Sequence, residues 1–287
     1  MMWPFRRVKK RHQAADVGEF YNRYNDKFLE VYGDLIQAFR TQDPTGILEH
    51  EAGQMGLKDG MKLLDAGCGV AYPALYFADK FQVEVDAVTI SSEQVKLAKE
   101  KVKASEKSEQ VKIHLGDYHE LEKKLPHQHY DLVYYLESFG HSPDKKKALQ
   151  SAWKVLKPGG AVYIKDLFRR KGCDQLMQER IDIEIEKINT AYRYEIADLP
   201  DLIDTAREIG FVLEWVQMID IPLEEFENLS ISNVFQELTG IGKIEDWDNY
   251  IFPVDFFELR LYKPNFDLTQ RQDRYFLQTM LYQKGGQ

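Results

Sequence analysis

An acidic residue beside two closely spaced glycines is the strongest chemical signal in this chain. The run Asp-Ala-Gly-Cys-Gly occupies residues 65–69 and directly follows an apolar segment typical of a short strand. Glycines at such a point let the backbone turn tightly and approach a ligand where a side chain would clash. Asp65 would repel a pyrophosphate, and neither a Lys-Ser/Thr pair nor a third glycine follows Gly69. The run therefore favours a positively charged ligand, and a glycine turn that only serves packing is the alternative.

Polar residues after the next expected strand suit the sugar of a nucleoside ligand. This strand is expected over 83–90, and Thr89, Ser91 and Gln94 lie at its end or just beyond it. They follow the glycine turn by about twenty residues, the spacing at which a ribose is bound in sheets of alternating strands and helices. A helix N-cap would also explain Ser91.

A third expected strand, 111–115, is followed by a candidate for base recognition. Asp117 can accept a hydrogen bond from an adenine amino group, and Tyr118 is its neighbour. Leu136, at the end of the strand expected over 130–136, is a further candidate contact. A turn residue would be the simpler role for Asp117 alone. Taken in order with the acidic glycine turn, the series favours S-adenosylmethionine, which joins adenosine to a sulfonium and an ammonium group.

His141 is the candidate for proton transfer, because the unperturbed pKa of histidine is about 6.5. It follows the strand at 130–136, on the edge of the sheet where such folds bind ligands. Methylation of a hydroxyl requires that its proton be removed. We therefore expect His141 to be the general base and Asp166, near the end of the neighbouring strand 161–167, to accept its N–H. A helix-entry histidine before a capping Ser142 is the alternative.

The elements that must position these residues alternate from Lys62 onwards. Short apolar runs are separated by segments with one apolar helical face, such as Val95, Ala98 and Val102. This alternation predicts an α/β fold with a mostly parallel sheet and right-handed crossovers. The carboxyl ends of the strands then meet at one edge, where the candidate residues lie. Strands are expected over 63–66, 83–90, 111–115, 130–136, 161–167, 212–220 and 273–284, and helices over 93–104, 144–157 and 195–208.

Four motifs within residues 61–168 resemble the class I S-adenosylmethionine-dependent methyltransferases of the small-molecule and natural-product branch. The resemblance implies a Rossmann-like sheet of seven strands, the last one antiparallel, with helices on both faces. It also implies that S-adenosylmethionine is the cofactor and that Asp65, Ala66, Gly67 and Asp117 contact it. The motifs are Asp-Ala-Gly-Cys-Gly at 65–69, Gly-Asp at 116–117, Glu-Ser-Phe-Gly-His-Ser-Pro-Asp at 137–144 and Leu-Lys-Pro-Gly-Gly at 156–160.

The resemblance also bears on residues outside these contacts. Thr89 stands where many members have an acid that binds both ribose hydroxyls, and Thr89 and Gln94 are expected to bind them instead. Tyr21, in an aromatic helix, resembles the segment that closes over the donor in the natural-product branch. His141 and Asp166 resemble the base pair of sugar and natural-product O-methyltransferases.

Glu137 leaves the type of methylation open. In carbon methyltransferases that act on alkenes, a glutamate after this strand stabilises the carbocation or removes a proton afterwards, whereas hydrogen bonds to neighbouring backbone are the simpler role. We expect methylation of a hydroxyl on a small, partly apolar metabolite. Carbon methylation of an unsaturated lipid or isoprenoid through Glu137 is one alternative, and a non-catalytic partner protein on the same fold is another.

The chain is expected to divide into a core with added segments at both ends. Residues 221–266 are rich in aromatic residues, their acids outnumber their bases, and they are too long for a hairpin loop. We expect an inserted cap or an oligomer interface there. The expected parts are a basic tail at 1–16, a helical lid at 17–56, the S-adenosylmethionine-binding core at 57–220, the cap at 221–272, and the last core strand with a tail at 273–287.

Composition excludes several other functions. The 287 residues carry 38 basic and 47 acidic side chains, and the resulting net charge of −9 disfavours binding to nucleic acid. No apolar run approaches the length of about 20 residues that a membrane helix needs. Two cysteines are too few for a disulfide scaffold or a thiolate metal cage, and His127 and His129 lack a third ligand nearby. We expect a soluble, cytoplasmic enzyme without a metal, acting on a small molecule, with a homo-oligomer as an option.

Overall fold

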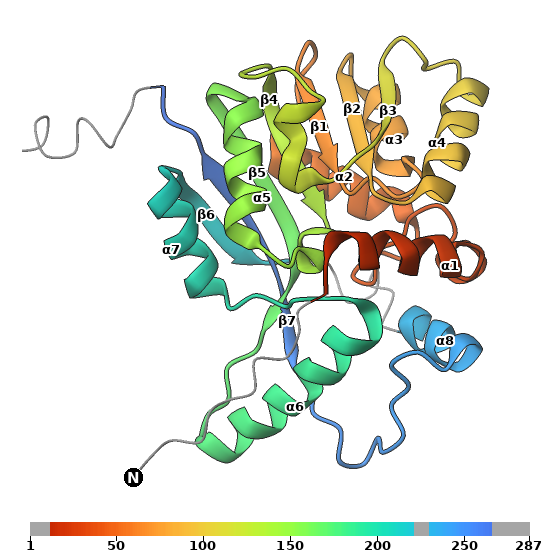
Figure 1. Ribbon diagram of the computed structural model, residues 1–287, viewed down its shortest axis with the longest axis vertical. Helices are drawn as coiled ribbons and strands as arrows, with labels where there is room; N and C mark the ends of the chain where they lie inside the picture. Colours follow the sequence, from red (N-terminus) through yellow and green to blue (C-terminus); the bar gives the residue numbers. More distant parts are fainter. Residues whose placement is uncertain (1–11, 221–229, 266–287) are drawn as a thin grey trace, which may run out of the picture.

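The computed structural model describes residues 12–220 and 230–265. In these residues seven strands form one sheet, in the order β3-β2-β1-β4-β5-β7-β6 (Figure 1). Pairing is parallel from β3 to β5, and β7 is antiparallel to both β5 and β6. The predicted Rossmann-like sheet with one antiparallel strand is confirmed. The strands are β1 (Lys62–Ala66), β2 (Glu84–Thr89), β3 (Val111–Leu115), β4 (Tyr130–Leu136), β5 (Leu156–Arg169), β6 (Val212–Met218) and β7 (Val254–Tyr262).

Helices cover both faces of the sheet, and each face has its own apolar core. Leu63 and Leu64 are adjacent in β1 and fully buried, one in each core, because successive strand residues point to opposite faces. This is why the strand is apolar throughout and lacks an alternating pattern. One core is formed with α2 (Pro44–Met55), α3 (Tyr72–Lys80) and α4 (Ser92–Ala104), and the other with α5 (Lys145–Val155) and α7 (Leu199–Ile209).

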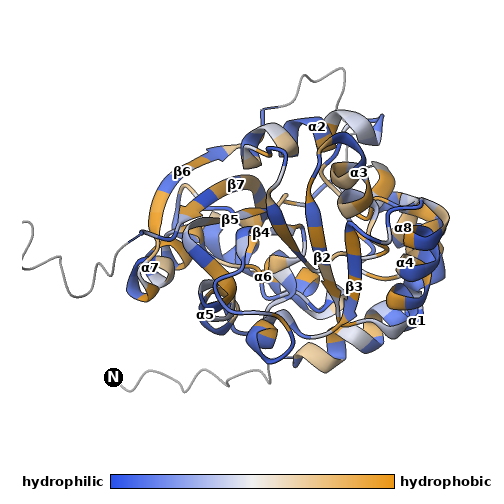
Figure 2. Cartoon of the chain, turned by 90° about the horizontal axis from the view of Figure 1, so that it is seen from above, coloured by the Kyte–Doolittle hydropathy of each residue, from blue (hydrophilic) through white to orange (hydrophobic). Residues whose placement is uncertain are grey.

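The remaining helices lie at the carboxyl edge of the parallel strands. These are α1 (Ala14–Tyr32), α6 (Gln175–Tyr192) and α8 (Ser230–Thr239), at the bottom of Figure 1. The rings of Phe28 in α1 and Phe235 in α8 stack with their centroids 4.3 Å apart. A methyl group added at Gly18 would lie 3.1 Å from the carbonyl oxygen of Ile90, so α1 packs directly on the turn after β2. Seen from above in Figure 2, α1, α4 and α8 lie together at the right and carry both hydrophilic and hydrophobic residues.

The prediction for the end of the chain is wrong in one respect. Residues 254–262, expected in the cap, form β7 in the middle of one half of the sheet. The charges that suggested an exposed segment are paired inside the fold: Glu258 is fully buried and accepts hydrogen bonds from Tyr163 and Gln217 at 2.6 and 2.7 Å. The strand expected over 273–284 lies outside the described residues.

Other boundaries differ by less. The first helix of the expected helical lid ends at Tyr32, because Gly33 has a φ of 65° and stops it. Helix α6 was not predicted, and α7 begins at Leu199 after an aspartate cap. Among the described helices, none combines the length and the apolar character needed to cross a bilayer.

Candidate active site

The turn after β1 forms one wall of a cavity. Gly67 and Gly69 have φ values of 101° and 54°, where only glycine is free of strain. The Gly67 and Cys68 N–H groups both donate to the carbonyl oxygen of Val88, at 2.8 and 3.0 Å, which fixes the turn on β2. A Cβ at Gly67 would lie 2.4 Å from the Cβ of Ser138, whereas the nearest atom to a Cβ at Gly69 is 4.0 Å away. Gly67 therefore serves close packing, and Gly69 opens the backbone to the cavity.

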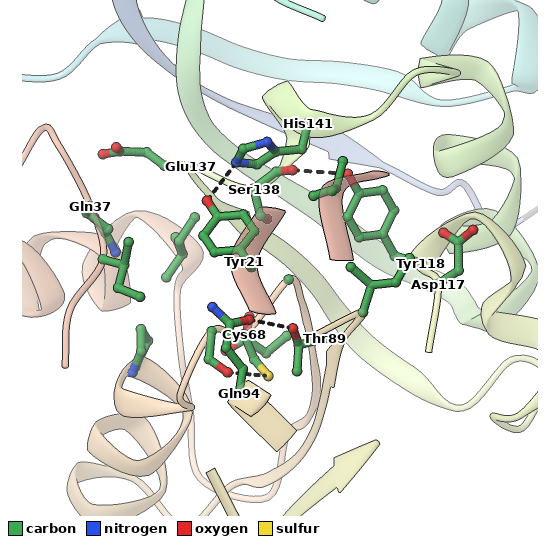
Figure 3. A pocket seen from close by; sticks show the side chains of 18 of the residues that line it. Tyr21, Gln37, Cys68, Thr89, Gln94, Asp117, Tyr118, Glu137, Ser138 and His141 are labelled. Atoms are coloured by element: carbon green, nitrogen blue, oxygen red, sulfur yellow. Dashed lines mark hydrogen bonds between the residues drawn. The ribbon is translucent and has the colours of Figure 1, made fainter. Parts of the chain in front are cut away.

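The empty space within the cavity and at its open mouth is about 840 Å³, and it lies at the edge of the sheet where such folds bind ligands. Ten of the predicted site residues line it, and they come from α1 and from the carboxyl ends of β1 to β4 (Figure 3). Ala66, Ser91 and Asp166 do not line it. The ten are Tyr21, Asp65, Gly67, Thr89, Gln94, Asp117, Tyr118, Leu136, Glu137 and His141.

Asp65 is the clearest sign of a cationic ligand. Asp65 is 2% exposed, and its Oδ2 makes no hydrogen bond of good geometry with the described residues, although the Tyr134 hydroxyl interacts with the carboxyl. Burial raises the pKa of Asp65 to about 8, because the charged form is poorly solvated. An unpaired buried carboxylate oxygen costs free energy unless a partner arrives, and a sulfonium or ammonium group is such a partner. The residues present thus fit S-adenosylmethionine.

The predicted ribose site contains a polar pair. The Thr89 hydroxyl donates to Gln94 Oε1 at 2.7 Å, and both side chains are buried beside the cavity. Ser91 does not line the cavity, and its predicted contact with S-adenosylmethionine stays a prediction. Its hydroxyl accepts from the Gln94 N–H as the α4 cap and donates to Asn22 Oδ1 at 2.7 Å, so it joins α4 to α1. The polar groups of Ser91 therefore serve the packing of two helices.

Asp117 and Tyr118 lie at the cavity as predicted. Asp117 Oδ1 accepts from the backbone N–H of His119 at 2.9 Å and lies 2.5 Å from its Nδ1. The Tyr118 hydroxyl donates to the carbonyl oxygen of Ser138 at 3.1 Å (Figure 3). Both residues after β3 are thereby joined to the loop after β4.

His141 is held as a neutral imidazole with a defined tautomer. Its Nδ1 lies 3.1 Å from the carbonyl oxygen of Arg193, which can only accept, so Nδ1 carries the proton. Its Nε2 is then the acceptor for the Tyr21 hydroxyl at 2.8 Å, at the cavity (Figure 3). Burial lowers the pKa of His141 to about 3. The ring of Tyr194 stacks on the imidazole with centroids 4.0 Å apart.

The predicted contact between His141 and Asp166 is wrong. Asp166 Oδ2 accepts from the Gly140 N–H at 2.7 Å and Oδ1 from the Leu167 N–H at 2.8 Å. Burial raises the pKa of Asp166 to about 6, and these two hydrogen bonds oppose that rise. Asp166 thus fixes the backbone before His141. The imidazole is oriented by the backbone carbonyl of Arg193, a partner that no pattern of side chains could reveal.

Glu137 lines the cavity, but its carboxylate is engaged elsewhere. It accepts from the Ala38 and Phe39 N–H groups at 2.6 and 3.1 Å and pairs with Lys165 Nζ at 2.7 Å. Lys165 is fully buried and also donates to Gln37 Oε1 and to the Phe39 carbonyl oxygen. Glu137 and Lys165 therefore clamp the loop after α1 over the cavity, which is the backbone-bonded role that the sequence left open.

Several lining residues were missed by sequence reasoning. Residues 34–37 cover the cavity from the loop after α1, and Ser138 and His119 lie beside predicted residues. Tyr194 reaches His141 because Gly140 leaves room: a Cβ there would lie 2.6 Å from the tyrosine ring. Ser138 and Gly140 carried a signal in the sequence, since both lie inside the motif at 137–144.

A Rossmann-like sheet with one antiparallel strand, an acid-flanked glycine turn and a cavity at the carboxyl edge defines a class I S-adenosylmethionine-dependent methyltransferase. Residues 45–223, more than half of the chain, match the family model described as mycolic acid cyclopropane synthetase. The chain belongs to this family. The predicted class and cofactor are confirmed.

Curated relatives include enzymes that methylate oxygen and carbon. The chain is 29% identical over 170 residues to O-methyltransferase rstn1 of Aspergillus nomiae, with 56% of this chain and 75% of that protein covered. It is 30% identical to 27-O-demethylrifamycin SV methyltransferase of Amycolatopsis mediterranei, covering 53% and 58%. It is also 30% identical to sterol 24-C-methyltransferase erg6 of Aspergillus fumigatus, covering 54% and 42%. The matched region is thus little more than half of this chain.

Solved structures confirm the fold over most of the chain. The crystal structure of the [4+2]-cyclase SpnF superposes with a TM-score of 0.72 at 19% identity, covering 88% of this chain and 97% of that one. The mycolic acid cyclopropane synthase CmaA1, complexed with S-adenosylhomocysteine, gives a TM-score of 0.69 at 17% identity, covering 89% and 100%.

Proposed function

We propose that the chain transfers a methyl group from S-adenosylmethionine to a hydroxyl oxygen of a small, uncharged metabolite. The observation that carries the proposal is the hydrogen bond from the Tyr21 hydroxyl to His141 Nε2, at 2.8 Å. It marks the unprotonated nitrogen of a neutral imidazole at the cavity, with a hydroxyl already seated on it. An acceptor hydroxyl in that place would give its proton to the same atom.

The protonation states suit this role. S-adenosylmethionine, when bound, supplies a methyl group on a positively charged sulfur. His141 is neutral at physiological pH because burial lowers its pKa to about 3, so its Nε2 lone pair is unprotonated, although the same burial makes it a weaker base than an exposed imidazole. Burial raises the pKa of Tyr21 above its usual range, which keeps the phenol protonated as a donor or relay. The proton taken by His141 would leave a positive charge on the imidazole, and Asp166 holds the backbone of the preceding residue, Gly140, in place.

The charge of the cavity supports an uncharged acceptor. Its described lining contains no lysine or arginine, and four carboxylates: Asp34, Asp65, Asp117 and Glu137. A carboxylate or diphosphate group on the acceptor would meet no lysine or arginine in this lining, so its burial there would cost free energy. Apolar groups from Val17, Leu35, Ile36 and Leu136 fill much of the remaining wall.

Carbon methylation is the second candidate, because Glu137 lines the cavity and sterol 24-C-methyltransferase erg6 is among the relatives. A carboxylate there would stabilise a carbocation. The three contacts of Glu137 with Lys165 and the loop after α1 favour a supporting role over proton transfer. A non-methylating activity is a third candidate, since the fold is shared with a [4+2]-cyclase.

The test uses S-adenosylmethionine with an isotopically labelled methyl group and a panel of neutral phenols and alcohols. Mass spectrometry detects the transferred label, and the carbon chemical shift of the product distinguishes an ether methyl from a carbon-bound methyl. The proposal expects an ether. A carbon-bound methyl would support the Glu137 candidate, and heat of S-adenosylmethionine binding without label transfer to any panel member or to a metabolite extract would support the non-methylating one.

A further inference from the structure

A chain of three hydrogen-bonded side chains lies behind the cavity. Asp117 Oδ1 is 2.5 Å from Nδ1 of His119, and the Nε2 of His119 is 2.7 Å from the hydroxyl oxygen of Ser142. His119 is 5% exposed and Ser142 is fully buried, so water does not compete for these contacts. The order of groups resembles that of a hydrolase triad, but a buried serine hydroxyl cannot act as a nucleophile on a substrate.

The direction of the hydrogen bond between His119 and Asp117 is fixed by the carboxylate. Although partial burial opposes ionisation, the hydrogen bonds from the ring and backbone of His119 hold the pKa of Asp117 below its usual range. An ionised carboxylate only accepts, so Nδ1 of His119 donates to Asp117, and Nε2 lies against the Ser142 hydroxyl, which can donate or accept. Asp117 Oδ1 receives two hydrogen bonds, from the ring and from the backbone N–H of His119. Because both hydrogen bonds use Oδ1 of Asp117, neither occupies its Oδ2, which can face a ligand.

The hydrogen-bonded series Asp117–His119–Ser142 connects two parts of the site that are far apart in sequence. Asp117 lines the cavity at the end of β3, and Ser142 directly follows His141 after β4. The neighbouring Tyr118 hydroxyl makes a parallel link to the carbonyl oxygen of Ser138. Two adjacent residues after β3 therefore hold both ends of the segment that carries His141.

We propose that His119 is a positioning residue for the donor: it orients the Asp117 carboxylate toward the exocyclic amino group of the purine and ties it to the loop that carries His141. The inference rests on S-adenosylmethionine as the ligand and on Asp117 as the group that meets its purine. It does not depend on whether oxygen or carbon is methylated. It predicts that substitution of His119 changes recognition of the purine amino group of S-adenosylmethionine.

A comparison of two donors tests this inference. One is S-adenosylmethionine, and the other is the analogue with hydrogen in place of the purine amino group. For His119→Phe, which removes both ring nitrogens, we expect the affinity for S-adenosylmethionine to fall by about tenfold to a hundredfold, as for a hydrogen bond to a charged group. The affinity for the analogue is expected to change less than about threefold. The analogue lacks the amino group that Asp117 would bind, so the orientation of Asp117 does not affect its binding.

Two further variants separate the contact of His119 with Asp117 from its contact with Ser142. In His119→Asn the amide nitrogen takes the place of Nδ1, and in His119→Gln it takes the place of Nε2. His119→Asn should therefore bind S-adenosylmethionine more tightly than His119→Gln. Calorimetry gives the affinities, and thermal unfolding shows that each variant is folded. If His119→Phe does not fold, the order of the Asn and Gln variants decides, and an equal or reversed order overturns the inference.

The matched control is His114, whose Nε2 lies 2.6 Å from Asp86 Oδ1 in a pair outside the cavity. His114→Phe should leave both affinities unchanged. Equal weakening of both donors by His119→Phe would show a loss of packing only and would overturn the inference, as would no weakening at all. Failure of the wild type to bind S-adenosylmethionine would instead refute the assigned cofactor.

Discussion

The two ends of the cavity differ in how their polar groups are satisfied. At the donor end, Asp65 Oδ2 is buried and makes no hydrogen bond of good geometry in the described structure. At the other end, His141 bonds to Tyr21 and Arg193, and Glu137 bonds to Lys165 and the loop after α1. Both ends are buried, so the difference does not come from exposure to water.

This difference indicates how each end is used. An unpaired buried group stores a cost that a bound ligand removes, so the donor end is preorganised for binding. A fully bonded end is stable alone, and an acceptor must exchange one of its hydrogen bonds for its own. Affinity for the donor should thus depend on single residues of the first end, and turnover and stability on the second.

The largest effect is expected at His141. His141→Ala should lower kcat by about 10²–10⁴ through loss of the general base, while the affinity for S-adenosylmethionine stays within about threefold of the wild type. Label transfer and calorimetry measure the two quantities. His114→Ala, outside the cavity, is the control for a histidine that is not catalytic. An equal loss of donor affinity and turnover would show that the two ends are not separate.

Lys165 tests the stability of the fully bonded end. Lys165→Met leaves the buried Glu137 carboxylate without its cation, which should lower the free energy of unfolding by about 3–5 kcal/mol. Urea unfolding measures this change. Lys157→Met is the control, because Lys157 pairs with Asp131 at the surface, where such a pair contributes about 0–1 kcal/mol. Similar losses for the two variants would remove the contrast between buried and exposed pairs.

Asp65 tests the donor end. Asp65→Asn should weaken S-adenosylmethionine binding by about tenfold to a hundredfold, the value of a charge-assisted hydrogen bond. It should leave the pKa of His141 nearly unchanged and should not lower the unfolding free energy of the ligand-free protein, because it removes a carboxyl group whose burial is costly. A stronger effect on stability than on binding would contradict the assignment of Asp65 to the ligand.

The pH dependence of donor binding follows from the same residue. The pKa of Asp65 is about 8 without ligand, so the carboxyl is largely protonated at pH 7. A cationic ligand favours the ionised form, so binding releases a proton below pH 8, and affinity rises with pH until it levels off above 8. Calorimetry in buffers of different ionisation enthalpy measures the released proton. Asp65→Asn should abolish both the release and the slope.

Tyr21 should give the smallest effect. Tyr21→Phe removes one hydrogen bond to His141 Nε2, worth about 0.5–1.5 kcal/mol. Turnover should change by about threefold to tenfold, with kcat changed more than donor affinity if the hydroxyl relays the proton. An unchanged kcat would mean that the acceptor hydroxyl displaces Tyr21 completely.

Sequence reasoning located the donor end better than the catalytic end. Asp65, Thr89, Gln94 and Asp117 each follow a parallel strand, and parallel strands bring their carboxyl ends together whatever the details of packing. The partner of His141 was mispredicted because Asp166 is close in the sheet but engaged with backbone N–H groups. The role of the loop after α1 depends on Lys165, which lies far away in sequence.

What the sequence determined by itself is the run of strands from β1 to β6, the helices α4, α5 and α7, and most of the residues at the carboxyl edge, because these follow from local periodicity and the geometry of parallel sheets. Only the tertiary structure decided which groups are paired: the carbonyl of Arg193 for His141, Lys165 for Glu137, and His119 for Asp117. The physical reason is that a hydrogen bond requires a fit of tenths of an ångström between segments distant in sequence, and no pattern along the chain encodes that distance.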